Sequence, residues 1–74
     1  MKKLSDLMPK SCFVIEEIDS LLQDSLLAYG LFPGTDATLL YRLPFKGPLV
    51  LLIRDSCISL RYAHAKKIGV REYV

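Results

Sequence analysis

Short apolar segments separated by turn residues make up most of this chain. Bulky and β-branched side chains over 12–18 predict a first strand. Further strands are expected over 37–43, 49–54, 57–62 and 67–72. The alternation of apolar and other residues is most regular in the second strand, at Ala37, Leu39, Tyr41 and Leu43. The pattern therefore predicts about five short strands, which favours a small closed or half-closed barrel over a sandwich.

One helix is expected between the first two strands. Ser20 and Gln23 have the spacing of a capping box, and Gly30 stands where a left-handed C-terminal cap is needed. Apolar side chains recur between them at helical spacing: Leu22, Leu26, Tyr29. These signals predict an amphipathic helix of about ten residues, and a turn follows at 31–35. A single helical turn is expected over 63–66, and the polar leader 1–11 offers three possible apolar anchors: Leu4, Leu7, Met8.

The two strands over 49–54 and 57–62 define a candidate binding face. If Asp55-Ser56 is a two-residue hairpin loop, Ile53 faces Ile58 and Leu51 faces Leu60 on the core side. The opposite side then combines two aliphatic side chains with basic and small polar ones: Val50, Leu52, Arg54, Arg61, Cys57, Ser59. Aliphatic residues beside arginines are typical of a modest protein-binding surface. The alternative interpretation is that the helix or the leader covers the aliphatic pair.

Composition narrows the class of protein. Hydrophobic residues make up 51% of the 74 residues, yet the longest apolar run, 49–53, is five residues long. A membrane-spanning helix needs about 20, and no signal peptide pattern follows the N-terminus. Two cysteines are too few for a disulfide scaffold, and a net charge of +2 is too weak to indicate nucleic-acid binding. We therefore expect one soluble cytoplasmic domain, residues 1–74, with no membrane insertion and no nucleic-acid partner.

Candidate chemistry is sparse. His64 is the one histidine, and with Cys12 and Cys57 it forms no local metal-binding motif. A Cys57–His64 nucleophile and base pair would lack an orienting third group. Glu16 and Glu17 are adjacent in a strand and would point to opposite faces. We predict no catalytic residue, no metal site and no cofactor, hence a binding protein and not an enzyme.

Four segments, in order, resemble the FeoA family. The helix end and turn resemble its Gly-Leu and Pro-Gly-Thr signature, and the loop 44–48 resembles its Pro-x-x-Gly-Asp-Pro loop. The segments that carry the resemblance are the leader Leu4-Ser5-Asp6-Leu7, the stretch from Leu26 to Thr35, the loop Pro44-Phe45-Lys46-Gly47-Pro48, and Ile58-Ser59-Leu60-Arg61 with Ala65, Ile68 and Val70. Three departures are Lys10 after Pro9, the missing Asp before Pro48, and His64 where Glu is common.

The resemblance implies an SH3-like barrel with one helix inserted after the first strand. It also implies a cytoplasmic accessory or regulatory protein of ferrous iron uptake that binds the FeoB-type membrane permease, whose cytosolic part carries a GTPase domain. On this interpretation the partner-binding candidates are Val50, Leu52, Arg54, Arg61, Phe45 and Lys46. The alternative function is a stand-alone metal-responsive regulatory SH3-like module. In metal-dependent repressors the same module accompanies a helix-turn-helix and a dimerisation region, neither of which is expected in this sequence, and this favours the transporter accessory. Homo-oligomerisation is left open.

Overall fold

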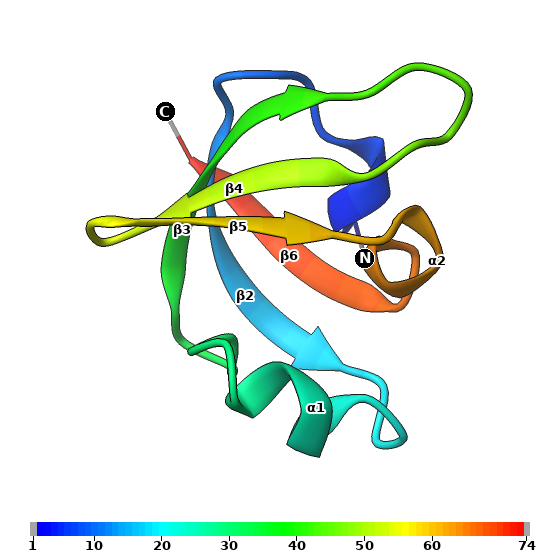
Figure 1. The fold of residues 1–74 in the computed structure, drawn as a ribbon. Helices are drawn as coiled ribbons and strands as arrows, with labels where there is room; N and C mark the ends of the chain where they lie inside the picture. The colour runs from blue at the N-terminus through cyan, green and yellow to red at the C-terminus, as the bar shows by residue number, and fades with distance from the viewer. Residues whose placement is uncertain (1, 74) are drawn as a thin grey trace.

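A six-stranded antiparallel sheet curls around one hydrophobic core in the computed structural model, which describes residues 2–73 (Figure 1). The predicted domain, 1–74, extends one residue beyond this range at each end. The strands are β1 (Lys2–Lys3), β2 (Cys12–Ile18), β3 (Asp36–Arg42), β4 (Leu49–Ile53), β5 (Ser56–Leu60) and β6 (Ile68–Tyr73). The helical elements are the 3-10 turn η1 (Leu4–Asp6), α1 (Gln23–Leu27) and α2 (Tyr62–Ala65).

The predicted mainly β, SH3-like architecture is confirmed. All five predicted strands form within a residue or two of their expected ends, and α1 follows the first long strand, β2. The order across the sheet is β1-β6-β2-β3-β4-β5, so β1 and β5 are its two edges and the barrel stays half-closed. A sixth strand, β1, was not predicted, because Lys2 and Lys3 carry no strand signal. It pairs with Val70 and Gly69 of β6.

The leader is anchored by two of its three candidate residues. Leu4 and Leu7 are fully buried in the core, whereas Met8 is 69% exposed. Arg42 strengthens the attachment, since its Nη1 donates a hydrogen bond of 2.9 Å to the carbonyl oxygen of Leu7. Next to Pro9, Lys10 adopts a left-handed conformation with φ of 74°, in which a non-glycine residue is uncommon.

The capping box predicted at Ser20 is wrong. The carboxylate of Asp19 accepts a hydrogen bond from the backbone N–H of Leu21 at 2.9 Å, and this Asx-type turn occupies the positions before the helix. The side chain of Gln23 donates to the carbonyl oxygen of Ile18 instead of reaching Ser20. As a result α1 begins at Gln23 and has five residues, about half the predicted length.

The predicted C-terminal cap of this helix is confirmed. Gly30 has φ of +82°, and its N–H donates to the carbonyl oxygen of Leu27 at 2.9 Å. The N–H of Leu31 donates to the carbonyl oxygen of Leu26 at 3.0 Å, which completes a Schellman pair. Leu26 and Leu31 are both buried, so the end of the helix is fixed to the core.

A β-bulge changes which side chains of β3 face the core. Leu39 pairs with Leu51 and is fully buried, but the pairing shifts at Leu40, so Tyr41 pairs with Val50. The extra residue turns Tyr41 to the outer face of the sheet. The regular alternation read from the sequence therefore holds for Ala37 and Leu39 only.

Candidate partner-binding surface

The hairpin of β4 and β5 has the predicted faces but a different register. Its loop is Arg54-Asp55, one residue earlier than expected, so Ile53 opposes Ser56 and Leu51 opposes Ile58. Arg54 makes this loop possible by adopting φ of 56°. Because the loop lies one residue earlier than predicted, each residue of β4 pairs with a residue of β5 two positions earlier than predicted. A shift of two positions leaves every side chain on its predicted face of the sheet.

The outer face of the sheet carries three neighbouring apolar side chains, Tyr41, Val50 and Leu52, which we call the outer apolar patch. Tyr41 opposes Val50 across β3 and β4, so both lie on the same face. Val50 and Leu52 are half-buried, and Tyr41 is 51% exposed. Sequence reasoning proposed the aliphatic pair but missed Tyr41 as its neighbour, because only the bulge brings Tyr41 to this face.

The loop between β3 and β4 presents the most exposed apolar side chain of the described chain. Phe45 is 99% exposed, and both Phe45 and Lys46 have a left-handed backbone, with φ of 60° and 58°. The N–H of Gly47 donates to the carbonyl oxygen of Pro44 at 3.1 Å, which closes a type I′ turn. This turn type prefers Asn-Gly at its centre, so Phe45 and Lys46 are held in a costly conformation. Strain of this kind is concentrated at functional sites.

The six predicted binding residues do not all lie together. The loop that contains Phe45 and Lys46 directly precedes β4. Arg61 directly follows β5, and the residues at these two strand ends, Leu49 and Leu60, pair with each other. The loop and Arg61 therefore lie at the same end of the hairpin. Arg54 lies at the opposite end, where β4 turns into β5 (Figure 1). The structure therefore groups the loop and Arg61 at one end of the outer apolar patch and separates Arg54 from them.

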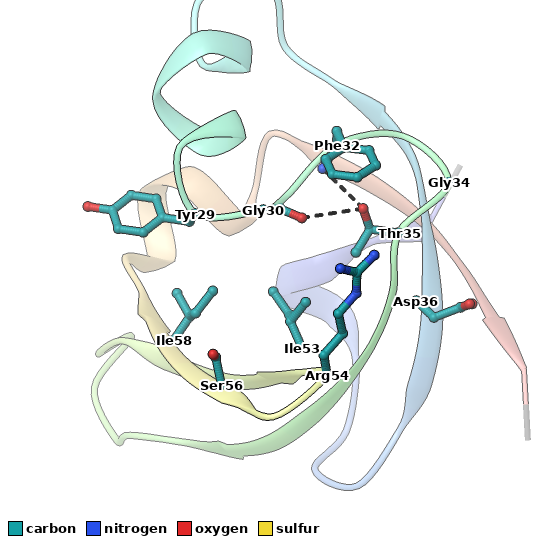
Figure 2. Close-up of a pocket in the computed structure, with 10 residues that line it drawn as sticks. All are labelled: Tyr29, Gly30, Phe32, Gly34, Thr35, Asp36, Ile53, Arg54, Ser56 and Ile58. Carbon is teal, nitrogen blue, oxygen red and sulfur yellow. Dashed lines mark hydrogen bonds between the residues drawn. The ribbon is translucent and has the colours of Figure 1, made fainter.

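Arg54 instead reaches into a groove on the other side of the hairpin, shown in Figure 2. The groove has a volume of about 570 Å³ and lies between β5 and the segment that joins α1 to β3. Its apolar lining comes from both walls: Tyr29, Phe32, Ile53, Ile58. The hydroxyl of Thr35 stiffens the second wall, because it accepts from the N–H of Phe32 at 3.3 Å and lies 3.4 Å from the carbonyl oxygen of Gly30. No pattern in the sequence had indicated this groove.

The residues considered for chemistry lie apart. Within residues 2–73, no three histidine, cysteine or acidic side chains come together in a group that could hold a metal ion. Cys12 is half-buried with its Sγ 3.6 Å from Oγ1 of Thr38, while Cys57 is exposed on β5. His64 lies in α2 and is half-buried. No helix in the same part of the chain is long and apolar enough to cross a membrane.

Two ionisable groups near the end of β6 have shifted pKa values. The pKa of Glu72 is lowered, first by a hydrogen bond from Lys2 Nζ at 2.8 Å and then by one from Ser11. The pKa of Tyr73 is raised, mainly by partial burial and then by the hydrogen bond of 3.1 Å that its hydroxyl donates to Asp36. The two contacts join β1 to β6 and β6 to β3, so both connect different strands of the sheet.

Comparison with known proteins places this architecture in a family. Residues 2–72 match the FeoA domain. Among solved structures, an iron uptake regulatory protein (FeoA) superposes with a TM-score of 0.85 at 22% identity, over 96% of this chain and 94% of that one. A FeoA-like protein from Clostridium acetobutylicum gives 0.85 at 26% identity, over 100% of this chain and 92% of the other. No curated protein sequence matches significantly.

The same fold occurs in larger proteins. The manganese regulator SloR contains a region that superposes with a TM-score of 0.86 at 15% identity, over 97% of this chain but only 34% of SloR. At that identity the similarity establishes the fold and nothing more. The family match, in contrast, extends over nearly the whole sequence from β1 into β6, and on this ground the chain belongs to the FeoA domain family.

Proposed function

We propose that this protein is a non-enzymatic accessory factor of ferrous iron uptake that binds the cytosolic, GTPase-bearing part of a FeoB-type permease. Membership of the FeoA domain family supports the transport role. The observation that carries the binding role is the outer apolar patch, whose apolar side chains remain partly exposed on a small protein. Exposed apolar surface of this kind is typical of protein interaction sites.

Residues around the patch support binding through this face. At one end, Phe45 offers an aromatic side chain free of packing, and aromatic residues are enriched among those that dominate binding energy. Lys46 and Arg61 lie at the same end of the hairpin and are both exposed. A partner surface that combines an apolar centre with acidic groups at its rim would complement this arrangement.

The test is direct binding of the full chain to the isolated cytosolic part of the permease encoded by the same organism, with and without guanine nucleotide. Leu52→Asp and Tyr41→Asp each introduce a charge into the outer apolar patch, and we expect at least about tenfold weaker binding for either. Leu27→Asp is the matched control, because Leu27 is 58% exposed on α1, outside the patch.

Circular dichroism establishes that each variant is folded. Because Leu52 is half-buried, the more exposed Tyr41 keeps the test valid if Leu52→Asp disturbs the fold. Absence of binding by the unmodified protein would contradict the proposal, and so would unchanged binding by a folded Tyr41→Asp protein. Normal ferrous iron uptake by a strain that lacks the gene would contradict the transport role.

A further inference from the structure

The two edges of the sheet differ in how they are protected. β1 is two residues long and consists of lysines, and both properties discourage another strand from pairing with it. β5 has five residues, with no lysine, no proline and no bulge in its pairing with β4. Of the two, β5 is the edge open to a further strand.

Backbone groups along β5 are free to accept such a strand. Ile53 and Ser56 flank the two-residue loop, so this pair exchanges hydrogen bonds, and the pattern repeats at every second residue. Cys57 and Ser59 therefore direct their N–H and C=O groups away from β4. Among residues 2–73, no turn or loop hydrogen bond engages either residue. The edge offers two donors and two acceptors in the spacing of an antiparallel ladder.

The groove lies along this same edge (Figure 2). Ile58 of β5 forms one wall, and Tyr29 and Phe32 form the facing wall with 59% and 41% of their surfaces exposed. A strand added to β5 would place every second side chain in the groove, because successive side chains alternate between faces. The groove therefore selects apolar residues at alternate positions of an incoming segment.

The charge of Arg54 determines which residue type fits one further position of the incoming segment. Arg54 reaches into the groove at the hairpin end, and no ion pair within the described residues engages its guanidinium. The acidic residue of the lining, Asp36, points away from Arg54 in Figure 2 and accepts a hydrogen bond from Tyr73. An acidic side chain on the incoming segment would therefore meet an uncompensated positive charge.

We propose that β5 and this groove bind an extended peptide segment of a partner protein by strand addition. Main-chain hydrogen bonds to Cys57 and Ser59 provide affinity, and the groove provides specificity, as in other proteins that bind peptides at a sheet edge. A segment that pairs antiparallel to β5 has its C-terminal end at the hairpin loop, beside Arg54. The side chains that face the groove are therefore apolar, apolar and acidic, in order from the N-terminus to the C-terminus of the segment. This site is separate from the outer apolar patch and does not rest on the proposed function.

The probe is the peptide acetyl-Thr-Val-Thr-Val-Thr-Glu-amide, titrated into ¹⁵N-labelled full-length protein to about 5 mM, since short segments of this kind bind weakly. We expect saturable shifts centred on the amides of Cys57, Ile58 and Ser59. A peptide N-methylated at its third and fifth residues lacks the two donors that face β5 and should bind about tenfold weaker or not at all. This comparison requires no change in the protein.

Two protein variants test the same contacts from the other side. Ser59→Pro removes an N–H that points away from β4, and an edge strand tolerates proline at such a position. This variant should not bind the peptide. Ser59→Ala keeps the N–H donor and should bind normally. Arg54→Glu should weaken binding of the original peptide and restore binding of a peptide that ends in Lys. Tyr41→Asp, in the outer apolar patch, should leave peptide binding unchanged.

Three outcomes would overturn the proposal. The first is no shift at the highest peptide concentration. The second is equal binding of the N-methylated peptide, which would show that no strand is added. The third is a concentration-dependent dimer in which the amides of Cys57 and Ser59 are protected from exchange without peptide, because a second copy would then be the occupant of the edge.

Discussion

The left-handed turn at Phe45 and Lys46 leads to an unusual prediction, namely that Lys46→Gly stabilises the protein. Lys46 has φ of 58°, a region that costs an L-residue about 1–2 kcal/mol and costs glycine almost nothing. Glycine in turn loses more entropy on folding, by about 0.5–1 kcal/mol. With the middle of each range, about 1.5 and about 0.75 kcal/mol, the net gain in the free energy of unfolding is about 0.5–1 kcal/mol.

Urea denaturation measures this gain. With a slope of about 1 kcal/mol per M for a domain of this size, the midpoint should rise by about 0.5–1 M. The thermal midpoint should rise by roughly 2–8 °C. Lys46 is exposed and makes no ion pair within residues 2–73, so the loss of its side chain removes no ion pair that would offset the gain.

The matched control is the same substitution at another exposed lysine. Lys66 has φ of −65° at the end of α2, so Lys66→Gly relieves no backbone strain and should lower stability by at least about 0.5–1 kcal/mol. The substitution also removes the contact of Lys66 Nζ with the Tyr62 ring, 6.0 Å from its centroid. The two substitutions are therefore expected to have opposite signs. If both destabilise the protein to the same extent, the assignment of strain to the loop is wrong.

Three further predictions concern the core, the helix cap and pH. Leu39→Ala, at a fully buried position, should cost about 2–5 kcal/mol in urea denaturation, whereas Leu21→Ala, at 85% exposure, should change stability by less than about 0.5 kcal/mol. Gly30→Ala should cost about 1–2 kcal/mol although a Cβ there meets nothing within 4 Å, so a smaller loss would show that φ of +82° is not required. The lowered pKa of Glu72 contributes stability above the ordinary carboxyl pKa of about 4.3, and this contribution is lost as pH falls through the folded-state pKa. Lys2→Ala should raise the pKa of Glu72 in an NMR titration, and an unchanged value would contradict the role of that hydrogen bond.

Five of the six strands could be predicted because β-forming residues in them stand beside turn residues, whereas the two lysines of β1 carry no such signal. The end of α1 was equally clear, since Gly30 is the residue type that a left-handed cap requires. The start of the helix was predicted wrongly because a local hydrogen bond competes with the predicted capping box. Asp19 and Ser20 are both residue types that favour turns and helix caps. Only the structure shows that Asp19, and not Ser20, accepts the hydrogen bond from the backbone, at the N–H of Leu21.

Features that depend on the backbone conformation of a single residue could not be predicted from sequence patterns. The bulge at Leu40 exchanges the faces of the residues after it, and no composition signal marks it. Likewise, Arg54 adopts a conformation that arginine rarely takes, which moves the hairpin loop by one position. The bulge brings Tyr41 to the outer apolar patch, and the hairpin loop places Arg54 at the groove, so the candidate sites could be predicted only in part.

The place of β6 in the sheet has a consequence for how the chain folds. This last strand lies between β1 and β2, so Lys2 pairs with Val70 and Cys12 pairs with Tyr73. These pairings join segments some sixty residues apart, and the entropy of closing such loops must be lost before the contacts form. Folding rates fall as contacts become more distant in sequence. We therefore expect folding in milliseconds to seconds, with the β2–β6 ladder as the cooperative step that the hairpin of β4 and β5 precedes.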